Sequence, residues 1–434
     1  MSKSLCIYPF VNLNSNTEGS IKLCCAIPEN IHITKNGKEI NFENTSIEDI
    51  WYSEYMTDIR KKMLAGERPE ACNTCWKLED MGIHSSRQSG WDEFKIIDDE
   101  FVKNIDFSEN PELPASLELR LGNFCNLRCN SCWALSSDRI ADERERMIKN
   151  DPDIPKWLVN SWRYELDMSK ESNWLWWESE EFERTIDELA PKLKRLYLTG
   201  GEPTLIQKNI EIMQKILDSG NDRCYIALTT NLTKFNEVFY NTMSRFIHGE
   251  VQISIDDIRD RNHYIRYPTQ WDHIEENLPK LYYTLPTNWK IKHYTVYQTF
   301  NYDTIPELID WIDLHRSYHE KEKYRHYIWS PILLDNTSYL DARIIQKPYR
   351  EEALVKLRDK LYNGVETHGT WWKHGVAQVI KFLENDHYTE EESVKLRKKF
   401  REFCDTMDRN RKSSCWYETF TEQLAQKVFS ESNP

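Results

Sequence analysis

The sequence predicts an α/β fold with a central set of parallel strands, and three observations support this. Short apolar segments alternate with longer helical segments between Ala115 and Asp335, as in repeated β/α units. The polar, cysteine-bearing segment before them and the polar segment after them lack this alternation. The chain has 434 residues, which is too many for one small core, so we expect two or three domains.

Three regions are expected along the chain. Residues 1–100 would form a small β-hairpin and helix domain, residues 101–335 the α/β region, and residues 336–434 a helical C-terminal extension. Residues 151–182 form a Trp-rich insertion within the α/β region. The expected strands are Ser116–Leu121, Arg195–Thr199, Tyr225–Thr229, Glu250–Ile255, Lys290–Thr299 and His326–Ile332.

The composition argues against several classes of function. The chain holds 57 Lys and Arg against 71 Asp and Glu, a net charge of −14, whereas nucleic-acid binding needs a basic surface. No apolar run is long enough to span a membrane, and the N-terminus lacks the apolar core of a signal peptide. We therefore expect a cytoplasmic protein, in which eleven cysteines favour metal binding over disulfides.

The first region carries five of the cysteines. Gly19 favours a tight turn between two short strands, of which Ile21–Cys24 would be the second. A helical apolar stripe then begins after Ser46, a suitable N-terminal cap. The cysteines of this region are Cys6, Cys24, Cys25, Cys72 and Cys75.

A second group of cysteines, Cys125, Cys129 and Cys132, follows the first expected strand. The polar segment Asp98–Pro114 would be the linker before it. Three thiols cannot all pair as disulfides, but they can hold one face of a metal centre. Because a [4Fe–4S] cluster normally takes four thiolates, one iron would stay open to a non-protein ligand, as at a catalytic zinc. A structural zinc site is the alternative.

Further motifs follow the later strands, at the ends where α/β folds place their chemistry. The second strand leads into Gly200-Gly201-Glu202-Pro203, whose glycines allow close backbone approach and whose carboxylate suits an ammonium group. The third strand leads into Asn231, the fourth into Ser254 and Arg266, and the fifth into Asn301. An Arg fork suits a carboxylate, although a surface salt bridge is the alternative for Arg266.

The cysteine spacing and the Gly-Gly-Glu-Pro segment resemble the signature of radical S-adenosylmethionine (radical SAM) enzymes. The resemblance implies a partial (β/α)6 barrel and a [4Fe–4S] cluster on Cys125, Cys129 and Cys132, whose open iron is chelated by SAM. It also implies that Gly200–Pro203 contacts the SAM amino group, Asn231 lies near the ribose, and Ser254 and Arg266 bind the carboxylate. One electron would then cleave SAM to methionine and a 5′-deoxyadenosyl radical, which abstracts a hydrogen atom from substrate.

Two positions depart from that family pattern. The glycine expected after Asn231 is Leu232, and the aromatic residue expected before the third cysteine is Ser131. Trp133 follows the cysteine instead, so adenine would be held differently or Trp133 would substitute.

The first region resembles the auxiliary-cluster modules called SPASM and twitch domains. Its C-x12-G-x4-C spacing fits their hairpin, but it has five cysteines rather than seven and precedes the barrel. The resemblance implies one auxiliary [4Fe–4S] cluster on Cys6, Cys24, Cys72 and Cys75, with Cys25 spare or a substitute for Cys24. A structural zinc site on the same four thiols is the alternative.

The remaining segments give weaker expectations. The Trp-rich insertion is expected to be a helix pair packed on the barrel, with an aromatic lid or a groove for a peptide or sugar ring as the alternative. The C-terminal region should hold helices at Glu351–Tyr362, Ala377–Glu384, Glu391–Met407 and Thr421–Phe429. Cys224, Cys404 and Cys415 are expected to be ordinary thiols.

The sequence therefore predicts a radical SAM enzyme acting in peptide or protein modification. The alternatives are dehydrogenation of a small alcohol or sugar-like compound, and a non-catalytic iron–sulfur or zinc-binding protein. The expected partners are the substrate and a reducing electron donor such as flavodoxin or ferredoxin.

Overall fold

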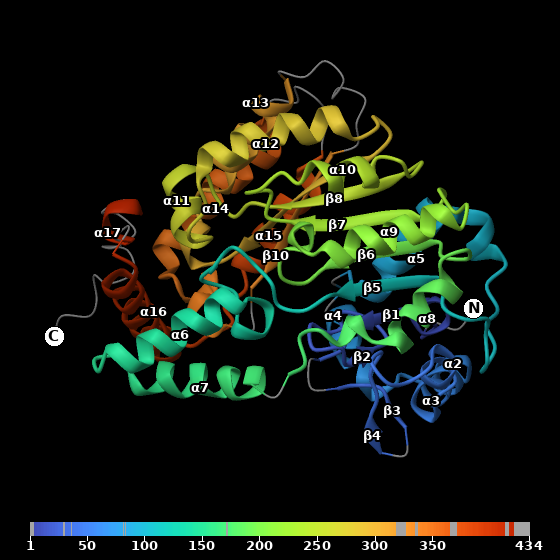
Figure 1. Ribbon diagram of the computed structural model, residues 1–434. Helices are drawn as coiled ribbons and strands as arrows, with labels where there is room; N and C mark the ends of the chain where they lie inside the picture. Colours follow the sequence, from blue (N-terminus) through green and yellow to red (C-terminus); the bar gives the residue numbers. More distant parts are fainter. Residues whose placement is uncertain are drawn as a thin grey trace. The chain divides into compact units, whose positions relative to one another are not determined.

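The computed structural model describes most of the chain, which divides into two compact units (Figure 1). The first unit comprises 1–124, 171–229 and 236–250, and the second comprises 125–170, 230–235 and 251–434. The described residues are 4–28, 31–35, 37–80, 82, 84–170, 172–317, 327–334, 337–364, 371–412 and 416–420.

Strands of the first unit follow one another in the hydrogen-bonded order β7-β6-β5-β1-β2. All neighbours are parallel except β1 and β2, which form an antiparallel hairpin. A separate small hairpin consists of β3 and β4. The strands are β1 Asn12–Ser15, β2 Ile21–Lys22, β3 Thr34–Lys35, β4 Lys38–Glu39, β5 Ser116–Arg120, β6 Arg195–Thr199 and β7 Tyr225–Thr230.

Helices of this unit begin where the sequence offers caps. Ser46 accepts a hydrogen bond from the backbone N–H of Asp49 at 3.2 Å, as expected, but the helix stops at Trp51 and a new one begins after Ser53, a second cap. The helices are α1 Tyr8–Val11, α2 Ile47–Trp51, α3 Glu54–Leu64, α4 Asn73–Asp80, α5 Ser86–Lys103, α8 Glu180–Leu189, α9 Gln207–Asp218 and α10 Glu237–Met243.

The predicted start of the linker Asp98–Pro114 is wrong, because its first residues belong to a helix. Helix α5 continues to Lys103, with a kink at Asp98 where φ is −158°. The Asp98 side chain accepts a hydrogen bond from the backbone N–H of Phe101 at 2.9 Å, and so it restarts the helix after the kink.

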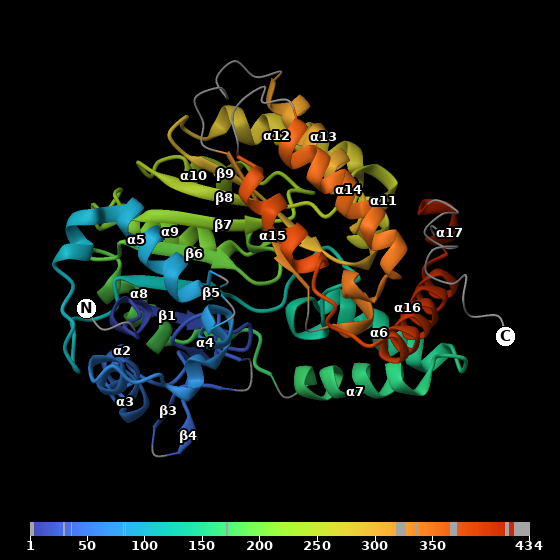
Figure 2. The same cartoon turned by 180° about the vertical axis from the view of Figure 1, so that it is seen from behind.

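The second unit contains β9 Lys290–Tyr297 and β10 Tyr327–Leu333, which are parallel. Strand β8, Gly249–Ser254, begins in the first unit and ends in the second. Helix α15 packs against β10 (Figure 2), where Gly375 leaves room for Trp329. The helices are α6 Asp138–Asn150, α7 Lys156–Lys170, α11 Arg259–Ile265, α12 Trp271–Thr284, α13 Ile305–Ser317, α14 Lys347–Asn363, α15 Lys373–Leu383, α16 Glu390–Arg411 and α17 Trp416–Thr419.

The predicted fold class is confirmed: β1, β2 and β5–β10 form a mostly parallel sheet with many helices. The six expected strands are present, each within about two residues of its predicted bounds. His326, Cys415 and the expected helix Thr421–Phe429 lie outside the described residues. None of the helices within the described part of the chain is long and apolar enough to cross a membrane.

Part of the Trp-rich insertion packs into the core of the first unit. Trp176 is fully buried, and its ring stacks on Phe42 with centroids 5.9 Å apart. Gly19, at φ +88°, is where this packing requires a glycine, because a Cβ there would meet the Trp176 ring at 2.6 Å. Trp176 is therefore a packing residue, as expected, rather than part of an aromatic lid.

Candidate active site

The three cysteines of the second unit lie on the loop from Cys125 to Cys132, and all three are half-buried. Asp138, at the start of α6, accepts a hydrogen bond from the Cys125 backbone N–H at 3.2 Å. The Leu127 N–H donates to the Cys125 sulfur at 3.5 Å, a contact that favours the thiolate form needed for metal binding. Cys132 N–H donates to the Cys129 carbonyl oxygen at 3.1 Å, which closes a turn.

A second segment of the same unit holds this loop by backbone hydrogen bonds. The Arg128 N–H donates to the carbonyl of Tyr267 at 2.6 Å, and the Asn130 N–H donates to the carbonyl of Ile265 at 2.8 Å. The Asn130 amide also donates to the Tyr264 carbonyl at 3.1 Å. The segment after β8 is therefore the support of the cysteine loop.

Arg411, at the end of α16, also supports the cysteine loop, and no sequence pattern indicated this role. Its guanidinium donates to the Asn130 side-chain oxygen at 2.7 Å and to the Arg128 carbonyl at 2.8 Å. It also pairs with Glu143 at 2.9 Å, and both side chains are nearly buried, 6% and 5% exposed. Arg411 is far from the motif in sequence, so only tertiary structure reveals it as a positioning residue.

Arg266 lies beside the cysteines and is not a surface residue. Its Nη1 is 3.2 Å from the Asp256 carboxylate, which is fully buried. Burial raises the pKa of Cys129, and the Arg266 guanidinium opposes that rise. Burial also raises the pKa of Cys132, to about 12. The salt bridge expected as the alternative therefore exists, but within the cysteine site.

Asn231 is connected to the cysteine loop through side chains. Its amide donates to the Asn126 side-chain oxygen at 2.9 Å, and Asn126 donates to the Thr233 hydroxyl at 2.8 Å. Leu232 has φ +53°, so it adopts the left-handed conformation for which a glycine was expected. Its buried side chain and the Asn277 hydrogen bond to its carbonyl hold that strained conformation.

The two remaining candidates of this unit lie at strand ends. Ser254 is the half-buried last residue of β8. Asn301 is fully buried, and its amide donates to the backbone carbonyls of Asp256 and Val296 at 2.7 and 2.9 Å. Asn301 thus fixes the backbone around Asp256.

The Gly200–Pro203 segment belongs to the first unit, where it packs on the backbone of Phe124, the residue before Cys125. A Cβ on Gly201 would lie 2.3 Å from the Phe124 carbonyl oxygen, and Gly200 has φ +114°. The Glu202 N–H donates to that same oxygen at 2.7 Å. The Glu202 carboxylate is buried and accepts from the Thr204 hydroxyl at 2.7 Å. Both glycines are therefore required by this local geometry.

Four of the five N-terminal cysteines line one cavity of the first unit. Cys6, Cys24, Cys72 and Cys75 surround it together with Arg87 and several apolar side chains. Burial raises the pKa of the Cys6, Cys24 and Cys75 thiols, and the backbone groups of Tyr8, Ala26 and Arg87, respectively, oppose that rise.

Cys25 does not line that cavity. Cys25 is exposed, and the charges that act on its thiol are those of Glu118, Arg120, Arg195 and Glu93. Burial raises the pKa of Cys72 to about 12, so metal binding at the cavity must release protons.

Neither group of cysteines is spaced for a single metal ion. Among the described residues, no three or more His, Cys, Asp or Glu side chains are arranged to hold one ion. A cubane cluster is held by cysteine thiolates, each bound to a different iron. The thiols around the cavity and on the loop are donors of that kind.

Comparison with protein families matches a central segment of the chain. Residues 119–312 match the sequence model described as the Radical SAM superfamily. The matched segment contains the cysteine loop, Gly200–Pro203 and Arg266, and it supports the radical SAM superfamily for this part of the chain. The comparison with curated proteins gave no match.

Several solved structures are remotely similar to this chain. The anSMEcpe structure with AdoMet and a Cp18Cys peptide bound is 13% identical, with a TM-score of 0.35, and the alignment covers 60% of this chain and 63% of that one. Streptococcus suis SuiB is 14% identical, with a TM-score of 0.36 and coverage of 86% and 71%. SuiB bound to its precursor peptide SuiA is 13% identical, with a TM-score of 0.35 and coverage of 77% and 68%. The chain thus spans less than two thirds of the length of anSMEcpe.

Proposed function

We propose that this chain is a radical SAM enzyme with one auxiliary [4Fe–4S] cluster. The observation that carries the proposal is the cysteine loop itself, which presents three half-buried thiols beside a half-buried arginine, Arg266. The loop lies within the segment that matches the radical SAM superfamily. A ligand set of three thiolates leaves a coordination position for SAM.

Cys125, Cys129 and Cys132 would hold a [4Fe–4S] cluster, which when bound supplies the electron that cleaves SAM reductively. The Leu127 N–H holds the Cys125 sulfur as a ligand. Among the described residues, Arg266 donates a hydrogen bond to Asp256 through Nη1 alone. The other N–H groups of its guanidinium are therefore available to the carboxylate of SAM.

The other site residues would orient SAM. Ser254 would assist Arg266 at the carboxylate, and Asn231 would lie near the ribose. In Gly200–Pro203, the two glycines would let SAM approach the backbone closely. The buried Glu202 carboxylate would bind the SAM amino group. The hydrogen atom would then be abstracted from a substrate bound at the same site.

The auxiliary cluster would be held by Cys6, Cys24, Cys72 and Cys75. Their common cavity supports this ligand set, with Cys24 rather than Cys25, which does not line the cavity. Four protein thiolates leave no open iron, so this cluster would serve electron transfer or structure rather than substrate ligation.

The substrate class we propose is a peptide or protein. The support is the large amount of chain outside the barrel, which offers surface for an extended substrate. A small alcohol or sugar-like compound is the alternative, and it would be shown by turnover without any peptide.

The test is anaerobic reconstitution followed by iron and sulfide analysis, and then incubation with SAM and dithionite. We expect about eight irons per chain, four for each cluster, and release of 5′-deoxyadenosine. About four irons with release would remove the auxiliary cluster from the proposal. No release, with or without candidate substrates, would favour a non-catalytic iron–sulfur protein.

A further inference from the structure

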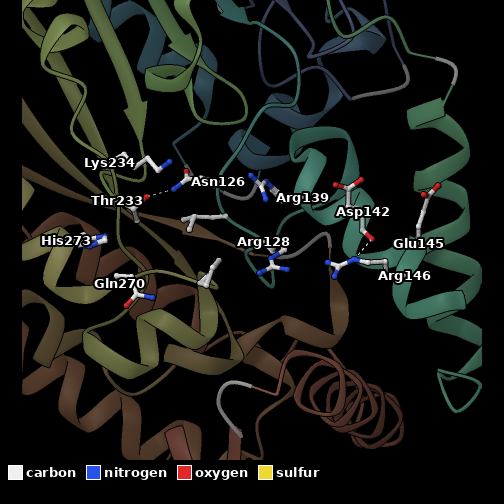
Figure 3. A pocket seen from close by; sticks show the side chains of 12 residues that line it. Asn126, Arg128, Arg139, Asp142, Glu145, Arg146, Thr233, Lys234, Gln270 and His273 are labelled. Carbon is white, nitrogen blue, oxygen red and sulfur yellow. Dashed lines mark hydrogen bonds between the residues drawn. The ribbon is translucent and has the colours of Figure 1, made fainter. Parts of the chain in front are cut away.

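A cavity of about 770 Å³ in the second unit has the cysteine loop as one wall (Figure 3). Asn126, Leu127 and Arg128, which line it, are the three residues between Cys125 and Cys129. Leu127 also donates its N–H to the Cys125 sulfur. The remaining lining residues are Arg139, Asp142, Glu145, Arg146, Thr233, Lys234, Pro268, Gln270 and His273.

The charge of this cavity is opposite to that of the chain. Four of its lining side chains are cationic, and only Asp142 and Glu145 are anionic, whereas the whole chain carries −14. A positive concavity on an acidic protein concentrates the field in one place and attracts an anionic partner.

Two of the cations are available to a partner. Arg139 and Lys234 are exposed, and their side chains make no ion pair within the part of the chain that the structure describes. Figure 3 shows them on either side of Asn126. Arg128, by contrast, already pairs with Glu143 at 3.2 Å. These two rim cations thus flank Asn126, a residue of the cysteine loop.

We propose that this cavity is the docking site of an acidic protein electron donor, an inference that rests on the proposed function. Electron transfer slows steeply with distance, and here a docked protein would be separated from Cys125 and Cys129 only by the loop between them. One electron leaves the donor and enters the site held by the three cysteines. No bond or proton needs to move at the interface.

A protein fits the cavity better than a small anion does. Arg139, Arg146 and Lys234 are exposed cations, and exposed charges contribute association rate and orientation more than affinity. Asp142 and Glu145 would repel an anion held at the centre, whereas an acidic surface can place its carboxylates opposite the cations alone. Small, polar and transient interfaces of this kind are typical of electron-transfer encounters.

The test uses the reconstituted full-length protein and a flavodoxin as the probe. Arg139→Glu and Lys234→Glu reverse the rim charge, and Arg163→Glu makes the same change on the exposed face of α7. We expect each rim variant to weaken flavodoxin binding at low salt about tenfold, while Arg163→Glu changes it less than about twofold. Wild-type binding should weaken as salt is added.

Activity supplies the second readout. Dithionite-driven cleavage of SAM should be equal in all four proteins, while flavodoxin-driven cleavage should fall in the rim variants only. Unchanged flavodoxin binding by both rim variants would overturn the proposal. So would rim variants that lose only the binding of inorganic phosphate, because the cavity would then be a small-anion site. A wild type inactive with dithionite would count against the proposed function, whereas the binding data would still decide the docking site.

Discussion

The two cysteine sites of this chain differ in the number of thiols and in how deeply they are buried. In the first unit, Cys6, Cys24 and Cys75 are buried and Cys72 is half-buried around a single cavity. In the second unit, three half-buried thiols lie on one short loop. The first site draws its ligands from residues as far apart in sequence as Cys6 and Cys75, and the second draws them from eight consecutive residues.

This difference matches the difference between closed and open metal sites. A closed site takes all its ligands from the protein, whereas a catalytic site keeps a position for substrate or cofactor. The loop also has a cation, Arg266, beside Cys129, which suits an anionic group of an incoming ligand. The comparison predicts that chemistry depends on the loop and that the cavity supports it.

Loss of a loop cysteine should have the largest effect. Cys129→Ala leaves two thiolates, which cannot hold the cluster, so formation of 5′-deoxyadenosine should fall by about a thousandfold or more. Iron should fall from about eight to about four per chain, because the cavity of the first unit keeps its ligands. Product analysis and iron content check both parts, and unchanged turnover would remove the loop from the active site.

Loss of a cavity cysteine should change iron content without removing the site of SAM cleavage. Cys24→Ala or Cys72→Ala should lower iron by about four per chain, because the mostly buried cavity gives little access to an external ligand that could replace the missing thiolate. 5′-Deoxyadenosine should still form under dithionite. Cys25→Ala is the matched control, because Cys25 adjoins Cys24 but does not line the cavity. If Cys25→Ala lost the iron and Cys24→Ala kept it, the ligand set would be wrong.

Local pattern was enough to predict the strands and both cysteine groups. The six strands are short apolar segments with turn or loop signals after them, and each was found within about two residues. The cap at Ser46 is a similar case. Strands and helix caps depend on residues that are close in sequence, so a local sequence pattern is enough to predict them.

Contacts between distant segments were not predictable in this way. Nothing local indicates that β1 pairs in parallel with β5, or that Arg411 reaches a loop about 280 residues earlier in the chain. The left-handed Leu232 is a further case, because a buried β-carbon at φ +53° is stable only through packing and the Asn277 hydrogen bond.

Arg411 offers a smaller perturbation that should affect one site only. Arg411→Ala would leave the Glu143 carboxylate and the Arg128 carbonyl with fewer partners in a buried position, at a cost of about 2–4 kcal/mol in stability. We expect a lower unfolding midpoint and weaker SAM binding, with the auxiliary cluster retained. Arg409→Ala is the control on the same helix, because the Arg409 side chain is 44% exposed and its ion pair with Asp151 should contribute less than the buried contacts of Arg411.

The smallest expected effect is a difference in the rate of iron loss to a chelator. A chelator must reach the iron, and the loop thiols are more exposed than those around the cavity. Cys24→Ala, which keeps only the loop cluster, should therefore lose iron several-fold faster than Cys129→Ala, which keeps only the cavity cluster. Added SAM should slow the loss from Cys24→Ala alone, because it occupies the open position. Faster loss from the cavity would mean that the first unit, rather than the second, carries the open site.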